Sequence, residues 1–318
     1  MIGAPRAAAW GGDLDIRPPR SIMRVDGRCH GPIGSTMQSI FAIGTTSAIF
    51  LAAIAGLVVG SWLTRVVDRL PRIMDYDWEA QFREWRGEAT QPEEDRPSLW
   101  RRACRCPACQ APVTGWRRLP LLGWLLLRGR CGACGQSISW RYPVLEGMTA
   151  LGFAACVWRF GPGVQAVWAM LLVAGLLALA WIDMDTGLLP DVITLPLLWA
   201  GLLANVADTF APTTQAVLGA AVGYGLLWLL FHGYRMLTGR EGMGYGDFKL
   251  LAALGAWLGL AALPLLLLAA SLTGALAGLF LIATRRARRG QPQPFGPYLA
   301  AAGIVALFCG GLPPGWLT

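Results

Sequence analysis

Residues 164–191 read VQAVWAMLLVAGLLALAWIDMDTGLLPD, an apolar run that ends in a cluster of acids. Val164–Ile182 contains no charged residue. At 1.5 Å per residue it forms a helix of roughly 28 Å, close to the ~30 Å hydrocarbon core of a bilayer. A carboxylate beside hydrocarbon is costly and is rare unless it has a function. The stretch therefore predicts a membrane-spanning helix with a functional carboxylate, Asp183, at its end.

A second aspartate occupies a similar place later in the chain. Asp247 lies in Gly-Tyr-Gly-Asp-Phe-Lys, just before the uncharged run 250–284. Two carboxylates that share one proton can activate water and protonate a leaving group, as in aspartic proteases. We therefore predict a membrane aspartic peptidase with Asp183 and Asp247 as its catalytic pair. Because both patterns are short, solvated loop acids or helix caps remain the alternative.

The composition indicates a protein that crosses the membrane many times. The 318 residues are 55% hydrophobic and 14% charged, whereas a soluble domain is about 25% charged. The run 250–284 would form a single helix of about 52 Å, so two helices joined near Gly259–Pro264 fit better. We predict an all-α polytopic fold with about eight transmembrane helices, from the apolar segments 39–63, 144–158, 164–182, 192–207, 215–234, 250–284 (two helices) and 297–312.

The distribution of basic residues predicts the orientation. Fourteen of the 27 Lys and Arg residues lie between Arg65 and Arg141, and cytoplasmic loops collect such residues. With this segment in the cytoplasm, counting helices places both aspartates and the Arg285–Arg289 cluster on the cytoplasmic face. The segment also carries acids, so we do not expect it to bind nucleic acid.

These features divide the chain into four parts. Residues 1–36 are rich in Arg, Pro and Gly and lack the apolar core of a signal peptide. They are either a disordered tail or lie upstream of a true start at Met37. We expect residues 37–63 to be the first transmembrane helix, 64–142 a cytoplasmic loop and 143–318 the transmembrane peptidase domain.

Four cysteines in the cytoplasmic loop have the spacing of a zinc ribbon. Cys106, Cys109, Cys131 and Cys134 form Cys-x2-Cys-x21-Cys-x2-Cys, and two such turns can present four thiolates to one Zn²⁺. With four protein ligands the site is closed, so we predict a structural metal that supplies the fold of the loop. Four buried or redox-active thiols are the alternative, and Cys104 is a competing ligand with poorer spacing.

The first acidic loop offers three candidates for one catalytic role. Asp183 and Asp185 are two residues apart and cannot share a helix face. Asp191 follows Pro190 and is placed to cap the next helix. We therefore predict a structural role for Asp191 and leave Asp185 undecided.

Several groups of residues together carry a resemblance to a known family: Gly60-Ser61, Arg69–Arg72, the two Cys-x-x-Cys pairs, Ile138–Pro143 with Glu146, Ile182–Asp191, Gly242–Leu250 and Pro294–Tyr298. Over roughly residues 39–312 the chain resembles the type IV prepilin leader peptidases. These are bifunctional enzymes of the bacterial inner membrane that also act as N-methyltransferases.

The resemblance implies a substrate, a reaction and a cofactor. The substrate is a type IV prepilin or type II secretion pseudopilin precursor, cut after a Gly at the cytoplasmic edge of the lipid-embedded helix. The new N-terminus is then methylated from S-adenosylmethionine, a function assigned largely to residues 60–146. Asp183 and Asp247 are the implied catalytic pair. The chain departs from the family pattern at Thr64-Arg65 and Arg118, so a peptidase without methyltransferase activity is the alternative.

Two interpretations from other functional classes are alternatives to the enzyme hypothesis. A proton-coupled transporter can use intramembrane acids, but it is expected to place them near the midplane and to show internal repeats. A non-enzymatic membrane adaptor would use the zinc loop to recruit a partner, and its aspartates would be inert.

Overall fold

The computed structural model describes residues 32–88, 96–99, 106, 108–109, 111–112, 119–239, 243–285 and 293–310. The chain divides after Ala42 into two compact units, and the helical bundle belongs to the second, Ile43–Thr318. The described elements are helical apart from an isolated antiparallel bridge, Arg130–Ser137. They are α1 (Pro32–Trp85), α2 (Leu122–Leu126), α3 (Arg141–Phe160), α4 (Val164–Thr186), α5 (Asp191–Ala204), η3 (Asn205–Ala207), α6 (Thr213–Thr238), α7 (Tyr245–Leu258), η4 (Leu260–Ala262), α8 (Leu263–Ala283) and α9 (Gly296–Cys309).

Helix α1 is longer than the sequence suggested. The expected helix end at Leu63 lies inside α1, which continues to Trp85 as a charged helix. Ion pairs at i,i+4 spacing line this extension, with 2.8 Å between Asp68 and Arg72 and 2.6 Å between Glu79 and Arg83, and such pairs support a helix. At residues 63 and 64 the side chains of α1 therefore change from apolar to charged, but the helix itself continues. Of the predicted N-terminal extension, residues 1–31 lie outside the described part.

The long apolar run 250–284 forms two helices, as predicted. Helix α7 ends at Leu258, Gly259 has a φ of +82°, and α8 begins at Leu263 with a proline in its first turn. Glycine adopts such a positive φ without the penalty of a Cβ. Each of the other predicted apolar segments also coincides with a helix among the described residues.

Within the described part of the chain, four helices are long and apolar enough to cross a membrane, judged by length and composition: Gly44–Trp85, Val164–Thr186, Thr213–Thr238 and Leu260–Ala283. Two shorter apolar helices are Asp191–Ala207 and Gly296–Cys309. The all-helical, multi-spanning fold is thus confirmed, whereas the predicted count of eight spans is not. Helix α7 has only 14 residues, and α3 contains Glu146 and two arginines.

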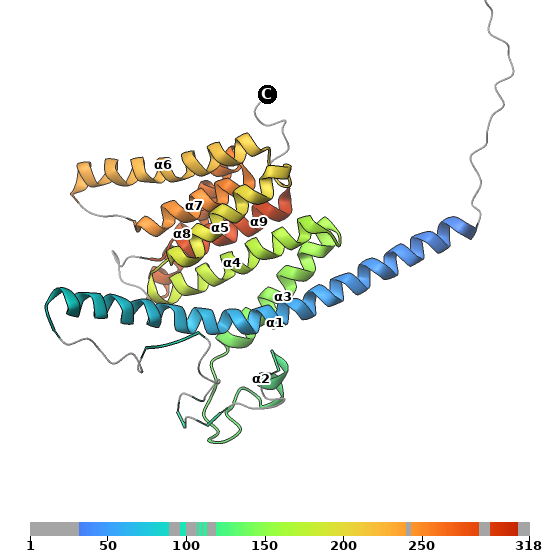
Figure 1. Ribbon diagram of the computed structural model, residues 1–318, viewed down its shortest axis with the longest axis horizontal. Helices are drawn as coiled ribbons and strands as arrows, with labels where there is room; N and C mark the ends of the chain where they lie inside the picture. The colour runs from blue at the N-terminus through green and yellow to red at the C-terminus, as the bar shows by residue number, and fades with distance from the viewer. Residues whose placement is uncertain are drawn as a thin grey trace, which may run out of the picture. The chain divides into compact units, whose positions relative to one another are not determined.

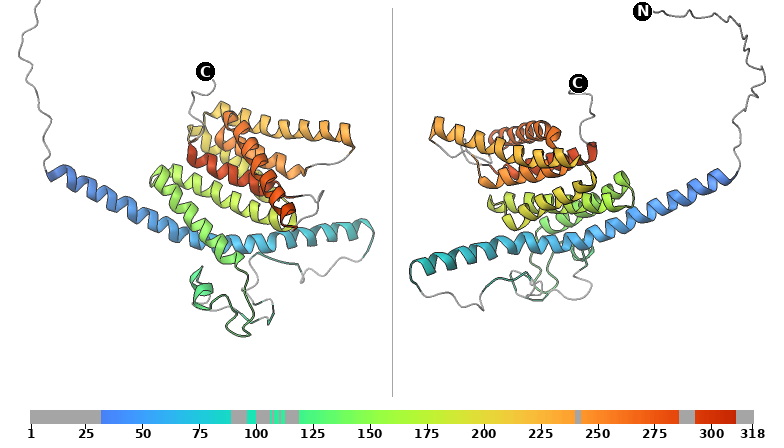
Figure 2. Two further views of the ribbon diagram at one scale, coloured as in Figure 1. Left: turned by 180° about the vertical axis from the view of Figure 1, so that it is seen from behind. Right: turned by 45° about the horizontal axis from the view of Figure 1, so that its top comes forward.

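Helix α7 forms the centre of the bundle. It packs mainly against α5 and α6, while α4 packs against α3 and α9 (Figures 1 and 2). Gly219 of α6 and Gly255 of α7 allow close approach, because a Cβ on Gly219 would lie 2.4 Å from the Gly255 carbonyl oxygen. Small residues at such crossings are typical of helices that associate within a membrane.

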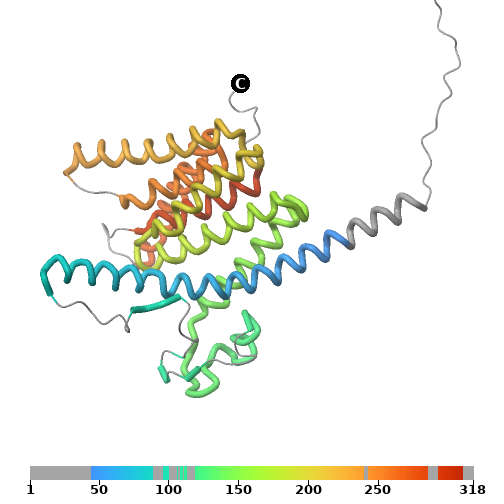
Figure 3. Tube along the Cα trace, in the orientation of Figure 1, coloured from blue at the N-terminus to red at the C-terminus, as the bar shows by residue number. Residues whose placement is uncertain are grey.

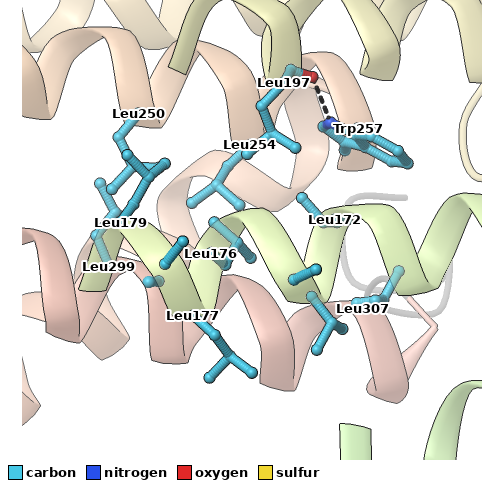
Figure 4. Packing of buried hydrophobic residues seen from close by; sticks show 14 of the residues in the cluster. Leu172, Leu176, Leu177, Leu179, Leu197, Leu250, Leu254, Trp257, Leu299 and Leu307 are labelled. Carbon is cyan, nitrogen blue, oxygen red and sulfur yellow. Dashed lines mark hydrogen bonds between the residues drawn. The ribbon is translucent and has the colours of Figure 1, made fainter. Parts of the chain in front are cut away.

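The apolar core joins α4, α7 and α9. Leu176 and Leu179 of α4 lie near Leu250 and Leu254 of α7 in the packed cluster, and Trp257 donates a 2.8 Å hydrogen bond to the Leu197 carbonyl (Figure 4). This packing fixes the end of α4 relative to the start of α7. These are the two places where the sequence predicted functional aspartates.

Candidate functional site

Asp183 lies in the last turn of α4 and is 5% exposed. Its Oδ2 accepts a 2.9 Å hydrogen bond from the backbone N–H of Gly296, the first residue of α9. A Cβ at position 296 would lie 2.6 Å from the same oxygen, so only glycine allows the backbone to come this close. The Pro-Phe-Gly-Pro-Tyr segment thus orients Asp183, a role that its sequence pattern alone did not reveal.

Asp247 lies in the first turn of α7 and is 7% exposed. Its backbone N–H donates to the Gly244 carbonyl at 3.3 Å. A Cβ on Gly246 would lie 2.7 Å from Cβ of Leu189, in the loop that follows Asp183. Gly246 therefore allows the two aspartate-bearing segments to pack together. Gly242, the first glycine of this motif, lies outside the described residues.

The fold brings these two buried carboxylates together although they are far apart in the sequence. A Cβ added to Gly296 would meet both Asp183 and Leu189, and one added to Gly246 would also meet Leu189, so the side chain of Leu189 links the two aspartate-bearing segments. Each carboxylate is bounded by backbone N–H groups and by apolar side chains such as Leu189. Two adjacent carboxyl groups in such a setting can hold a single proton between them, as acid-base hydrolysis requires.

The other two acids of the first loop bind cations. Asp185 pairs with Arg141 at the start of α3. Both oxygens of Asp191 lie 2.7 Å from Nζ of Lys249 on α7. The prediction that Asp191 caps the next helix is wrong, because Pro190 occupies the N-cap position and Asp191 is the first helical residue, with no side-chain cap. The undecided Asp185 and the structural Asp191 are both ion-pair residues.

The four predicted zinc ligands form one cluster. Their sulfur atoms all lie within 4.8 Å of one another. Sγ of Cys106 is 3.8 Å from Sγ of Cys134, and Sγ of Cys109 is 3.9 Å from Sγ of Cys131. Four sulfurs at ~2.3 Å from a tetrahedral zinc are about 3.8 Å apart. The donor set therefore fits the metal. The competing Cys104 lies outside the described residues.

The two Cys-x-x-Cys turns share one backbone pattern. The N–H of Cys106 donates to the Ala111 carbonyl at 3.0 Å, and that of Cys131 to the Gln136 carbonyl at 2.8 Å. The N–H groups of Ala133 and Cys134 point at the Cys131 sulfur and lower the pKa of this thiol to about 6. Thiolates are the form that binds metal. The turns thus favour the thiolate at Cys106 and Cys131, the first cysteine of each pair, whereas at Cys134 the Gln136 N–H is outweighed by the neighbouring cysteine sulfurs, which raise its pKa to about 12.

A cavity of about 470 Å³ is lined by residues of α1, the cysteine loop, α2 and α3. Figure 3 traces the backbone of these helices. Glu146 on its wall is 8% exposed and accepts a 2.6 Å hydrogen bond from the Leu121 N–H. Thr64 and Arg65, where the chain departs from the family pattern, also line it. The third departure, Arg118, lies outside the described residues. Sequence reasoning did not find this cavity because its walls come from three separate segments.

Comparison with known proteins gives a consistent result over most of the chain. Residues 170–279 match the family model described as the type IV leader peptidase family, and residues 54–160 match the bacterial Peptidase A24 N-terminal domain. A prepilin leader peptidase/N-methyltransferase of Aeromonas salmonicida is 47% identical over 85% of this chain and 92% of its own length. Proteins with the same description from Pseudomonas aeruginosa and Neisseria gonorrhoeae are 46% and 42% identical, over 82% and 81% of this chain and 90% and 89% of their own lengths. No solved structure matches the chain.

Proposed function

This chain belongs to the type IV leader peptidase family, and from that premise we propose that it cleaves leader peptides from prepilin-type precursors and methylates the new N-terminus. The observation that carries the proposal for cleavage is the burial of Asp183 and Asp247 at the ends of two helices that the core packs together, with Leu189 against both segments. The relatives, whose names give both activities, support the two-step function.

The pair performs general acid-base hydrolysis of a peptide bond. One aspartate is ionised and takes a proton from a water molecule, whose oxygen then attacks the scissile carbonyl. The other is protonated, hydrogen-bonds the carbonyl oxygen and supplies the proton that the leaving amine needs. The Gly296 N–H fixes the orientation of Asp183 for either role.

The protein acts in the bacterial inner membrane, in contact with lipid, and its large loop and its aspartates face the cytoplasm. The four membrane-compatible helices support a multi-spanning protein. The concentration of arginine between residues 65 and 141 supports the orientation. We assign proteolysis to residues 143–318 and methyl transfer to the loop formed by residues 64–142.

Two further components belong to the methyltransferase half. The four clustered cysteines hold a structural Zn²⁺, which the sulfur spacing supports. The methyl donor is S-adenosylmethionine, and the methyl acceptor is the N-terminal amine that cleavage creates. The substrates are type IV prepilins or type II secretion pseudopilins.

The test is processing of a prepilin by purified protein in lipid nanodiscs, followed by mass spectrometry of the product. Asp183→Asn and Asp247→Asn should each abolish cleavage, because neither retains a pair that shares a proton. Asp208→Asn is the matched control, since Asp208 lies in the exposed turn before α6 and bonds Thr213. Complete processing by either pair variant would refute the aspartate assignment. A mass increase of about 14 Da (one CH2) on the mature N-terminus reports methylation.

A further inference from the structure

The cavity between α1, the cysteine loop and α3 has the size and chemistry of a small-molecule site. Its volume of about 470 Å³ falls within the ~300–1,000 Å³ of ligand pockets. Neither Asp183 nor Asp247 lines it, so it is separate from the peptidase pair. We propose that this cavity binds S-adenosylmethionine. The inference rests on the methyltransferase activity proposed above and adds the location of its cofactor.

The described charged residues of the cavity are Arg65, Asp68, Arg69 and Glu146. Asp68 is paired with Arg72, and Arg69 donates to the Ser98 and Leu99 carbonyls, so Glu146 and Arg65 are the two that we match to the charges of this donor. S-adenosylmethionine carries a sulfonium and an ammonium, which are positive, and one carboxylate. Glu146 offers a buried carboxylate held in place by the Leu121 N–H. Arg65, one turn after Ser61 on α1, offers a guanidinium on the same lining. Opposite charges on two walls would orient the methionine part of the donor.

Aromatic side chains in the lining suit the rest of the molecule. Trp124 of α2 and Tyr142 of α3 both line the cavity. Nucleobases stack on such rings irrespective of sequence, and cations are attracted to ring faces. The Trp124 ring is fixed by a 3.2 Å hydrogen bond from its Nε1 to the Ile138 carbonyl. A ring held in this way loses little freedom when an adenine stacks on it.

The cysteine cluster forms part of the same wall. Cys106 and Cys131 line the cavity, together with Gly132 and Ala133 between the second pair of cysteines. A zinc bound to the four sulfurs would therefore shape the cavity without taking part in the transfer. This gives the predicted structural metal a specific task, because loss of the zinc would deform the donor site.

A second, smaller cavity lies on the route that we propose for the methyl acceptor. It measures about 180 Å³ and shares Thr64, Asp68, Ser139 and Tyr142 with the large cavity. Its lining also includes Trp181 and Asp185, which flank Asp183 in the sequence. An N-terminus released beside Asp183 thus has a lined path toward the donor.

The transfer needs no further reactant. The lone pair of the neutral N-terminal amine forms a bond to the methyl carbon as the bond from that carbon to sulfur breaks. The sulfur keeps the electron pair and becomes a neutral thioether, while the nitrogen takes over the positive charge. If the amine begins as an ammonium, its extra proton must leave first. Of the two carboxylates among the described lining residues, Asp68 is paired with Arg72, so Glu146 is the one that we propose accepts it.

The test measures binding of methyl-labelled S-adenosylmethionine to the full-length protein in nanodiscs, alongside cleavage and methylation of a prepilin. Glu146→Gln keeps an oxygen that can accept the Leu121 N–H but removes the charge. Arg65→Gln removes the guanidinium from an exposed position where it has little structural role. Each should weaken binding about tenfold or more and reduce methylation, while cleavage reports on folding. Glu79→Gln, a carboxylate-to-amide change on the exposed extension of α1, should bind like the wild type.

The possible outcomes separate the two proposals. If the wild type binds the donor and methylates, but Glu146→Gln and Arg65→Gln both bind equally well, the cavity assignment is overturned and the methyltransferase function stands. If the wild type cleaves but neither binds the donor nor methylates, the methyltransferase function itself fails and the cavity assignment with it. Weakened binding in both variants, with the Glu79→Gln control unaffected, supports the site.

Discussion

Gly296→Ala is the sharpest perturbation of the peptidase site, because it adds one carbon beside Asp183. The new Cβ would lie 2.6 Å from Oδ2 and 3.1 Å from Cγ of that carboxyl group. To restore an ordinary contact of about 3.4 Å, the carboxylate must move by roughly 0.8 Å. That movement breaks the 2.9 Å hydrogen bond from the residue 296 N–H.

Two independent considerations give the same magnitude. A hydrogen bond to a charged group contributes about 1.5–3 kcal/mol, which corresponds to a loss of roughly 10- to 150-fold in rate at about 1.4 kcal/mol per factor of ten. A misplacement of about 1 Å in a catalytic group can likewise cost on the order of 100-fold. We expect kcat/KM for prepilin cleavage to fall about 10- to 100-fold.

The assay is the rate of conversion of a purified prepilin in nanodiscs, followed by gel mobility and mass. Gly225→Ala is the matched control, because it makes the same change within α6 where no atom lies within 4 Å of the added carbon. Thermal unfolding of both variants shows whether Gly296→Ala still folds. A folded Gly296→Ala protein that cleaves at the wild-type rate would refute the argument that this N–H positions a reacting carboxylate.

Further predictions concern the core, the ion pair and the metal. Asn205→Ala should destabilise the protein by about 3–5 kcal/mol in thermal unfolding. The buried side chain bonds two carbonyls and two N–H groups, and each buried group left unsatisfied costs about 1–3 kcal/mol. Wild-type stability in this variant would contradict the assigned hydrogen bonds. Lys249→Met should cost no more than about 1 kcal/mol, because its partner Asp191 is half exposed, and a collapse of the fold would contradict this. Zinc removal by a chelator should make the cysteine loop sensitive to protease, since metal binding supplies about 10–16 kcal/mol of folding free energy in small zinc domains. Cys131→Ser should show the same sensitivity without a chelator, and protection in both cases would argue against a structural metal.

The sequence predicted features that depend on local pattern. The lengths of the apolar segments predicted the positions of the helices. The run of 35 uncharged residues is too long for one membrane span, which predicted the break that the structure places at Gly259. Cysteine spacing gave the cluster of four thiols. In each case the physical cause acts within a short stretch of chain, so one segment contains enough information.

Features that depend on distant partners were not predictable in this way. The ion pair between Lys249 and Asp191, which are far apart in the sequence, depends on the packing of α5 against α7. The contact of Gly296 with Asp183 likewise requires the packing of α9 against α4. The continuation of α1 beyond Leu63 was missed because hydropathy marks where a membrane ends and not where a helix ends.

The partners of the four acids near the site show why only two of them suit the chemistry. Asp185 and Asp191 are each paired with a cation, and a neighbouring cation holds a carboxylate in its ionised form. Among the described residues, the Asp183 carboxylate accepts the Gly296 N–H, and no salt bridge joins Asp183 or Asp247 to a cation. A hydrolytic pair must keep one proton that it can give up and regain, so a nearby guanidinium or ammonium would abolish its function. The bundle therefore separates the acids by their partners: Asp185 and Asp191 join its helices through cations, and Asp183 and Asp247 are the two whose surroundings suit the proposed proton exchange.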